Sequence, residues 1–353
     1  MKIGLMGGWN TDSGASLHSE LIGRAWVEEG IKLTVFTFYK ESFHGTQITG
    51  EDEEFVIRCF TTSRAEPQRL NPIPFLTEDY NVFVVEDLGM LPKDHLGKIF
   101  HRIKKKAITV NIIHDGKLTD DPSFYQFDWD AIVCFDERYR DFLKEAYDEE
   151  RIHIIPYPCH EQKIIDKTSA RRGLSLPQDK KILFTFGPAS YYTLSLVEDI
   201  FSFKEFILLV VTKHQNSLTG FYPLQERYPI IIREEAPDIN RLYEYLNSAD
   251  GLIFNKPSAR WVVVSSTVFQ CLGSGCPIIA YASNFIETLK DEVLRYHNRD
   301  EFLNCLRIVI EGGDRYQQVR ERGLAYVQRN SARNVARRYL QLFEDLLKRR
   351  RNA

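Results

Sequence analysis

The sequence predicts an α/β protein of two domains, each built on a parallel sheet with helices on both faces. Its 353 residues exceed what a single hydrophobic core normally serves. Short apolar runs alternate along the chain with stretches of helical periodicity, which is the pattern of βαβ units. Pro156-Tyr157-Pro158 interrupts this alternation. We therefore expect a first domain over residues 1–158, a second over 159–325 and a C-terminal helix over 326–353.

Composition narrows the functional classes. A hydrophobic share of 43% and a formal net charge of −3 are typical of a globular protein with no general attraction to nucleic acid. The six cysteines form no C-x-x-C pair, which favours free thiols in a reducing compartment. There is no H-E-x-x-H sequence to indicate a metal, and no apolar run of the roughly 18 to 20 residues that cross a bilayer. We expect a cytoplasmic protein without a metal cofactor.

The first domain begins with a βαβ unit. A strand at residues 2–6 leads into a glycine-rich loop, a helix at about 17–29 and a second strand at 33–38. Ligands of doubly wound sheets lie at the carboxyl ends of the strands, so the loop is a candidate binding segment. It is not a G-x-G-x-x-G sequence, which argues against a dinucleotide. A glycine-rich turn that binds nothing is the alternative.

A histidine later in this domain is the candidate catalytic residue. Apolar runs predict further strands at 55–60, 82–85, 108–113, 129–135 and 152–156. Helical spacing of apolar residues predicts helices at 92–105 and 137–147. His114 and Asp115 follow the strand at 108–113, at the edge where an open parallel sheet binds ligands. Asp115 either orients the imidazole or only caps the turn. A packed or surface histidine is the alternative for His114.

Residues 101–106, His-Arg-Ile-Lys-Lys-Lys, form the densest basic cluster of the first domain. One interpretation is a solvated helix end whose positive charges complement the helix dipole. The other is a contact with anionic lipid or with a phosphate-bearing acceptor, because clustered lysines attract negative head groups. The second interpretation would place the protein peripherally at a membrane.

The chain is organised around residues 242–283 in the second domain, which strands at 181–186 and 206–211 precede. A helix at 239–248, a strand at 251–254, a loop at 255–260, another helix and a strand at 278–281 form a parallel-sheet unit. Ser265, Ser266 and Thr267 stand where the second helix should begin. Exposed amides and hydroxyl groups at a helix start suit a phosphate or diphosphate, so we expect an anion site there.

This unit resembles the nucleotide-sugar glycosyltransferases of the two-Rossmann-domain, GT-B type, specifically the large retaining family 4-like group. The matching positions are Ala249-Asp250, Pro257-Ser258, Gln270 and the run Gly275-Cys276-Pro277-Ile278-Ile279-Ala280. Residues 14–38 resemble the first loop, helix and second strand of the same enzymes, and residues 151–160 resemble their strand and hinge that enter the second domain. The resemblance therefore covers nearly the whole chain. It implies a ligand cleft between the domains and a final helix that crosses back onto the first one. A broken apolar stripe over 315–350 permits such a helix.

The chain departs from this family in its charged residues. Retaining members carry Glu-x7-Glu, and the two positions hold Val262 and Gln270 here. Members usually place an arginine and a lysine after the first strand of the second domain, where Pro188 and several hydroxyl residues stand. Lys256 and Arg260 are the nearest substitutes for these cations, with ordinary surface charge as the alternative.

The resemblance also implies a set of site residues. Gly14 and Ala15 would let the backbone approach the donor phosphate or the acceptor, and His114 would face the donor sugar. The implied donor-binding residues of the second domain are Gly187, Lys256, Ser258, Arg260, Ser266, Thr267 and Gln270, with Ser266 and Thr267 on the diphosphate and Gln270 on the ribose.

The implied function is the retaining, metal-independent transfer of a sugar from a nucleoside-diphosphate sugar to an unidentified acceptor, which could be a carbohydrate, a lipid-linked molecule or a protein. The nucleotide sugar is the donor substrate, no separate cofactor is implied, and no nucleic-acid partner is expected. One alternative is a sugar-nucleotide sensor or partner subunit that keeps the fold without the catalysis. A further alternative is a sugar-nucleotide epimerase of the same architecture.

Overall fold

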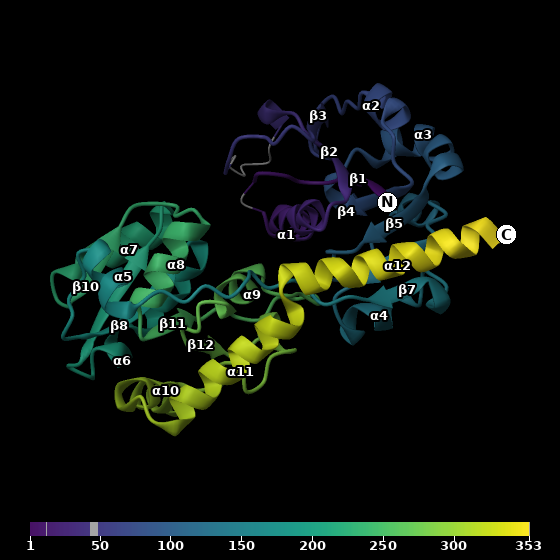
Figure 1. The fold of residues 1–353 in the computed structure, drawn as a ribbon. Helices are drawn as coiled ribbons and strands as arrows, with labels where there is room; N and C mark the ends of the chain where they lie inside the picture. The colour runs from purple at the N-terminus through teal and green to yellow at the C-terminus, as the bar shows by residue number, and fades with distance from the viewer. Residues whose placement is uncertain (12, 43–48, 353) are drawn as a thin grey trace. The chain divides into compact units, whose positions relative to one another are not determined.

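The computed structural model describes residues 1–11, 13–42 and 49–352. Contacts divide the chain into two compact units (Figure 1). Unit 1 comprises Met1–Pro158, Trp261–Ser266 and Ala332–Ala353, and unit 2 comprises Cys159–Arg260 and Thr267–Ser331. Each unit contains one parallel sheet, so the predicted α/β class with two Rossmann-like domains is confirmed.

The sheet of unit 1 has seven parallel strands in the order β3-β2-β1-β4-β5-β6-β7. The strands are β1 (Lys2–Met6), β2 (Lys32–Phe38), β3 (Val56–Phe60), β4 (Val82–Glu86), β5 (Ile108–Ile112), β6 (Ala131–Cys134) and β7 (Ile152–Ile154). Most of their residues are buried, as expected for a sheet covered on both faces. The helices are α1 (Gly14–Glu28), α2 (Pro72–Thr77), α3 (Lys93–Lys106), α4 (Glu137–Leu143) and α12 (Ala332–Asn352).

Two crossovers place helices on opposite faces of this sheet. The chain leaves β1 through α1 toward β2 on one side, and leaves β4 through α3 toward β5 on the other. Because such crossovers are right-handed, α1 and α3 lie on opposite faces. Helix α1 begins at Gly14, earlier than predicted, because the Ser13 side chain accepts a hydrogen bond from the backbone N–H of Ser16 at 3.1 Å.

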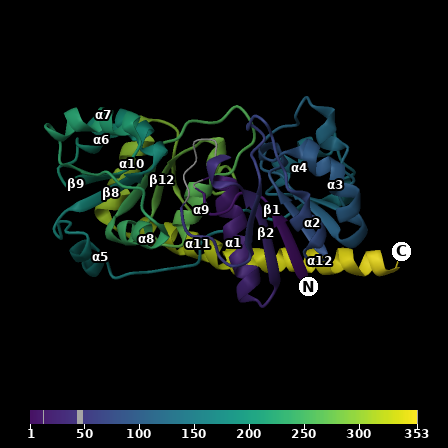
Figure 2. The same cartoon turned by 90° about the horizontal axis from the view of Figure 1, so that it is seen from above.

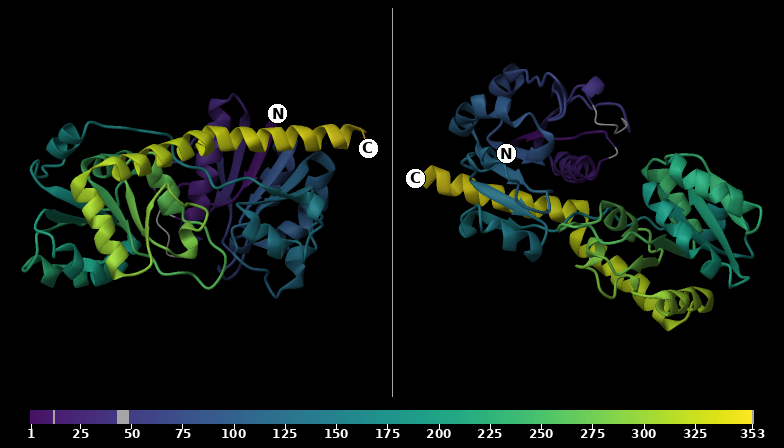
Figure 3. Two further views of the ribbon diagram at one scale, coloured as in Figure 1. Left: turned by 90° about the horizontal axis from the view of Figure 1, so that it is seen from below. Right: turned by 180° about the vertical axis from the view of Figure 1, so that it is seen from behind.

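The last helix packs back onto unit 1, as predicted. Helix α12 packs across α1 and also contacts β5 (Figure 2; Figure 3). The indole N–H of Trp26 on α1 donates to the Ala336 carbonyl of α12 at 3.1 Å. Tyr339 and Phe343 of α12 have no exposed surface and pack their rings against Trp26, with centroids 5.9 and 5.7 Å away. The final helix therefore supplies part of the core of unit 1.

Unit 2 holds a six-stranded parallel sheet in the order β10-β9-β8-β11-β12-β13. Its strands are β8 (Lys181–Phe186), β9 (Phe206–Val211), β10 (Ile230–Arg233), β11 (Gly251–Phe254), β12 (Ile278–Tyr281) and β13 (Leu294–Tyr296). Its helices are α5 (Lys167–Gly173), α6 (Val197–Ile200), α7 (Gln215–Gln225), α8 (Ile239–Ser248), α9 (Ser266–Leu272), α10 (Arg299–Glu311) and α11 (Asp314–Asn330), with the start of α9 assigned to unit 1. One hydrophobic cluster includes Leu183 of β8, Leu208 of β9 and Leu306 of α10.

Candidate functional site

The strand order of unit 1 creates a crevice between β1 and β4. These neighbours are followed by connections that run in opposite directions, and ligands of open α/β sheets bind at the carboxyl ends of such strands. Glu86 ends β4 at this position. Gly7 follows β1 and leaves space for the Glu86 side chain, because a Cβ atom on Gly7 would lie 2.7 Å from the Cβ of Glu86. The glycine after the first strand is thus needed for a buried carboxyl group.

Glu86 joins two histidines. One oxygen, Oε1, lies 2.8 Å from Nδ1 of His18 on α1, and the other, Oε2, lies 2.8 Å from Nε2 of His114 after β5. The two imidazole rings stand edge to face with centroids 5.2 Å apart. Glu86 and His18 have no exposed side-chain surface, whereas 13% of the His114 side chain is exposed. His114 is therefore the member of this cluster that a ligand could touch.

Burial sets the charge state of the cluster. It lowers the pKa of His18 to about 3, so this imidazole is neutral at physiological pH. It also lowers the pKa of His114, against the hydrogen bond and charge of Glu86. The pKa of Glu86 is raised by burial, and its hydrogen bond with His114 works in the opposite direction. Two neutral imidazoles flank one buried carboxyl group.

Within the described residues, His18, Glu86 and His114 form the group whose ligand atoms could hold a metal ion, since these atoms lie within 4.8 Å of one another. Two imidazoles and a carboxylate are a donor set that suits zinc or iron. Each Glu86 oxygen is already within hydrogen-bond distance of a histidine nitrogen, and two of the three side chains have no exposed surface. Hydrogen bonding accounts for the arrangement without a metal.

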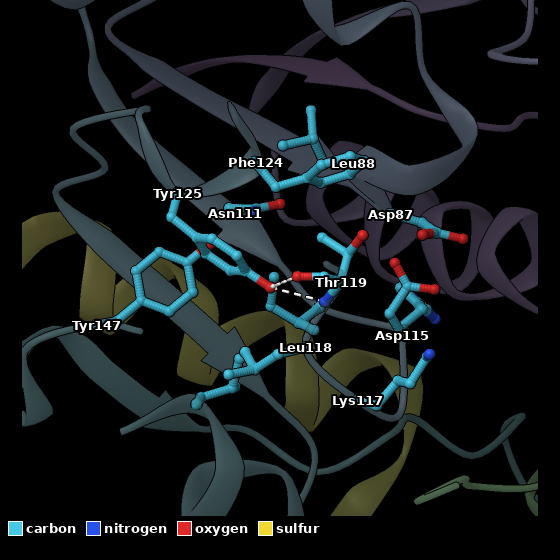
Figure 4. Close-up of a pocket in the computed structure, with 13 residues that line it drawn as sticks. Asp87, Leu88, Asn111, Asp115, Lys117, Leu118, Thr119, Phe124, Tyr125 and Tyr147 are labelled. Atoms are coloured by element: carbon cyan, nitrogen blue, oxygen red, sulfur yellow. Dashed lines mark hydrogen bonds between the residues drawn. The ribbon is translucent and has the colours of Figure 1, made fainter. Parts of the chain in front are cut away.

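A pair of carboxyl groups borders His114. Asp87 follows Glu86 with φ of 56°, a left-handed conformation that aspartate tolerates better than most residues. Its carboxyl group lies beside that of Asp115 at one side of a small cavity, with Tyr125 and Tyr147 on the other side (Figure 4). Burial, followed by the charges of Asp115 and Glu86, raises the pKa of Asp87 to about 8. The cavity, of about 30 Å³, has room for about one water molecule.

A short segment after β11 belongs to unit 1 by its contacts. The backbone N–H of Val262 donates to the Gly116 carbonyl at 3.2 Å, and a Cβ atom on Gly116 would lie 1.7 Å from the Val262 carbonyl oxygen. The Lys117 ammonium lies 4.5 Å from the centre of the Trp261 ring. The loop that carries His114 is therefore held against residues 261–262 by a contact that requires glycine.

The predicted residues Gly14 and Ala15 open helix α1. The carbonyl of Gly14 accepts a hydrogen bond from the Tyr157 hydroxyl at 2.8 Å. A Cβ atom on Gly14 would lie 3.2 Å from Oγ of Ser266, so a larger side chain would crowd this hydroxyl. Gly14 is exposed, whereas Ala15 is buried. The structure thus brings Gly14 close to one of the predicted diphosphate-binding residues.

Unit 2 has its own crevice, between β8 and β11, where the strand order again reverses. A hollow of about 400 Å³ lies at this edge, lined by Tyr191, Tyr192, Leu194, Ser195, Asn255, Pro257 and Tyr281. The Asn255 amide donates to the Tyr192 carbonyl at 2.8 Å and accepts from the Tyr296 hydroxyl at 2.6 Å. The loops after β8 and β11 are thereby tied together around the hollow.

Three of the predicted donor-binding residues flank this hollow in sequence. Gly187, with φ of 62°, precedes the 3₁₀ segment that carries Tyr191 and Tyr192. Lys256 and Ser258 lie on either side of Pro257, which lines the hollow. The Lys256 ammonium lies 4.1 Å from the centre of the Phe285 ring, and burial lowers its pKa.

The remaining predicted residues follow along the same connection. Arg260 is exposed, and Ser266 and Thr267 are partly buried in the first turn of α9, a helix of seven residues. Gln270 lies further along α9, and its carbonyl accepts a hydrogen bond from Tyr243 at 2.8 Å. Their roles in binding stay predictions.

Neither Glu86 nor His18 is among the candidate site residues of the sequence analysis. Glu86 directly follows the predicted strand at 82–85, so its position at a carboxyl end was a usable signal. Nothing in the spacing of His18, Glu86 and His114 along the chain indicates that they meet.

No helix among the described residues is both long enough and apolar enough to cross a membrane.

Comparisons with known proteins show where the fold recurs. No protein-family model matches the chain. A sucrose-phosphate synthase from Thermosynechococcus elongatus is 14% identical and matches over 99% of each chain with a TM-score of 0.69. The pneumococcal O-GlcNAc transferase GtfA in complex with UDP and GlcNAc is 10% identical, over 98% of this chain and 99% of its own, with a TM-score of 0.67.

An alpha-glucosyltransferase in complex with UDP is 12% identical and matches over 98% of this chain and 100% of its own, with a TM-score of 0.64. At these identities the likeness establishes the fold. The predicted resemblance is confirmed at that level, because the chain has, along nearly its whole length, the GT-B fold found in solved glycosyltransferases.

Proposed function

We propose that the protein transfers a sugar from a nucleoside-diphosphate sugar to an acceptor, with retention of configuration and without a metal ion. The observation that carries the proposal is the pair of crevices at the carboxyl edges of the two sheets, each lined by polar or aromatic side chains, in a GT-B fold. Two proteins with this fold were solved with UDP bound, which supports a nucleotide donor.

Unit 2 is assigned the donor. The hollow at its crevice presents the rings of Tyr191 and Tyr192, which are 50% and 37% exposed, and flat aromatic surfaces suit a nucleobase or ribose. Lys256, Arg260 and the hydroxyl groups of Ser266 and Thr267 follow along the connection after β11, and in the proposal they bind the diphosphate. Gln270 is assigned to the ribose because its amide both donates and accepts hydrogen bonds.

Unit 1 is assigned the reacting sugar and the acceptor. His114 is the partly exposed member of a buried polar cluster, next to the acidic cavity of Asp87 and Asp115. In the proposal its imidazole binds the donor sugar near the reacting carbon, and the acceptor approaches the same edge of the sheet. No covalent nucleophile is assigned. In the proposal the departing diphosphate is stabilised by Lys256, Arg260 and the hydroxyl groups of Ser266 and Thr267.

A second candidate function is a sugar-nucleotide-binding subunit without catalysis. One observation favours it. Val262 stands at the position of the first glutamate of the Glu-x7-Glu pattern that retaining members of the family carry. Its backbone is hydrogen-bonded to Gly116, so a valine side chain occupies this place in a fixed segment. An apolar group cannot replace a carboxylate in binding a sugar hydroxyl.

The proposal is tested by calorimetric titration with UDP, GDP and ADP sugars, with and without divalent metal, followed by product analysis. Saturable binding of one donor and formation of a new glycoside are expected without metal. Binding without turnover toward any acceptor would favour the subunit function, and an isomerised donor would indicate an epimerase.

The site assignment is tested with Thr267→Val, which replaces the hydroxyl group by a methyl of similar size. Donor affinity should fall about five- to tenfold, as expected for one hydrogen bond of about 1 kcal/mol. Thr168→Val is the matched control, because Thr168 is an exposed threonine on α5. Equal affinity in the two variants would reject the role of Thr267.

A further inference from the structure

The cluster of His18, Glu86 and His114 has a directional hydrogen-bond pattern. A carboxylate only accepts hydrogen bonds, so each histidine nitrogen that faces an ionised Glu86 must carry a proton. Nδ1 of His18 and Nε2 of His114 both lie 2.8 Å from a Glu86 oxygen. Each neutral imidazole has a single proton, which leaves Nε2 of His18 and Nδ1 of His114 as acceptors.

The two acceptor nitrogens, Nε2 of His18 and Nδ1 of His114, have different surroundings. Nε2 of His18 faces the Tyr339 hydroxyl of α12 at 3.5 Å, inside the core of unit 1. Nδ1 of His114 has no hydrogen-bond partner among the residues that the structure describes, and His114 lines the cavity next to Asp87 and Asp115. The one unused acceptor of the cluster therefore belongs to its one partly exposed member.

We infer that Glu86 is ionised in the folded protein and is a positioning residue that holds His114 as its Nε2–H tautomer, so that Nδ1 is presented as a neutral acceptor to a hydroxyl group of the bound sugar. The inference rests on the proposed function for the identity of the ligand. It assigns His114 a ligand of stated chemistry, a hydrogen-bond donor such as a sugar hydroxyl. An oxyanion of the diphosphate would instead need a donor or a cation at this position.

The surroundings of His114 support a neutral ring. Its imidazole packs edge to face on Phe135, with centroids 4.9 Å apart, and on His18. The titratable groups around it are Glu86 on β4, His18 on α1, and the other titratable side chains that line the cavity, which are Asp87, Asp115, Lys117, Tyr125 and Tyr147. Among these, Glu86 is the group within hydrogen-bond distance, so removal of its negative charge is the change to which the tautomer should respond.

The first test is ¹⁵N NMR of histidine-labelled protein, with the His114 signal assigned from a His114→Gln sample. Between about pH 7 and 8, above the ordinary imidazole pKa of about 6.5, we expect a protonated Nε2 and an unprotonated Nδ1. A protonated Nδ1, or an imidazolium at pH 7, would overturn the inference. A shift of the His18 and His114 signals on addition of Zn²⁺ would replace it by a metal site.

The second test is kinetic and compares Glu86→Gln with Glu54→Gln, which changes an exposed glutamate of the same unit. A glutamine amide can donate to Nε2, so His114 can switch to the Nδ1–H tautomer. We expect kcat to fall about tenfold or more with unchanged donor Kd, the loss of about one hydrogen bond in the transition state. Equal kcat values for the two variants would contradict a positioning role.

The two tests separate this inference from the proposed function. The NMR experiment needs no substrate, so it remains decisive if Glu86→Gln fails to fold. The expected tautomer together with no sugar transfer would reject the proposed function and keep the positioning role of Glu86. Sugar transfer by a protein in which His114 is the Nδ1–H tautomer would reject the positioning role of Glu86 and support the proposed function.

Discussion

Replacing Phe343 of α12 by alanine tests whether the C-terminal helix is part of the core of unit 1. The Phe343 side chain has no exposed surface, and its ring lies 5.7 Å from that of Trp26 and 6.0 Å from that of Tyr339. Truncation of a fully buried phenylalanine costs about 3–5 kcal/mol, because it removes apolar burial and leaves a cavity. At about 2–4 °C per kcal/mol, Tm should fall by about 6–20 °C.

Intrinsic fluorescence during thermal unfolding is the assay, because all four tryptophans belong to unit 1. Trp9, Trp26 and Trp129 are at most 1% exposed in the native state, so their emission should change sharply when unit 1 unfolds. Glu344→Ala changes an exposed neighbour on the same helix and should leave Tm within about 2 °C, as expected for a surface substitution. Equal Tm values for the two variants would refute the packing of α12 on α1.

Three further predictions concern the site. His114→Ala should lower kcat at least tenfold with little change in donor affinity, a loss of about one hydrogen bond in the transition state, and unaltered kcat in turnover assays would reject its role. Tyr192→Ala should weaken donor binding, measured by calorimetry, because it removes part of the aromatic surface of the unit 2 hollow. An unchanged Kd would show that the nucleobase of the donor does not bind on this surface. Asp87→Asn should stabilise the protein by an amount that grows as the pH rises from about 4 to about 8 and then levels off, with little effect at pH 4. The raised pKa of Asp87 means that the folded state binds an extra proton between the ordinary aspartate pKa and about 8, so this group makes stability fall as pH rises through that window. Tm values of both proteins from pH 4 to 9 measure the difference, and parallel curves would contradict the assignment.

Most of the fold could be predicted because the signals were local. Buried strands such as β8 and β9 are continuous apolar runs, and their observed bounds equal the predicted ones. Helix α8 has a one-sided apolar pattern and Asp238 as its N-cap, whose side chain accepts from the backbone N–H of Arg241. Edge strand β13, with three residues, has too short a pattern to be read from sequence.

The candidate site was less accessible to prediction for a physical reason. His114 was identified because it follows a strand directly, and the carboxyl edge of a sheet is a known ligand position. Its partners come from α1 and β4, and their meeting depends on the strand order and on the space that Gly7 leaves. The Asp87–Asp115 pair likewise depends on β4 and β5 being neighbours. Such contacts are set by topology, which periodicity along the chain does not encode.

The packing of α12 also has a consequence for how the protein is made. Trp26 is synthesised before unit 2, but the helix that covers it is synthesised after unit 2. Between Pro158 and Ala332 the ribosome must add the whole of unit 2, which takes roughly 9 to 35 s at about 5–20 residues per second. During that interval the nascent first domain carries an uncovered apolar face on α1, a surface suited to chaperone binding. The domain that is begun first is thus completed only after unit 2 has been synthesised.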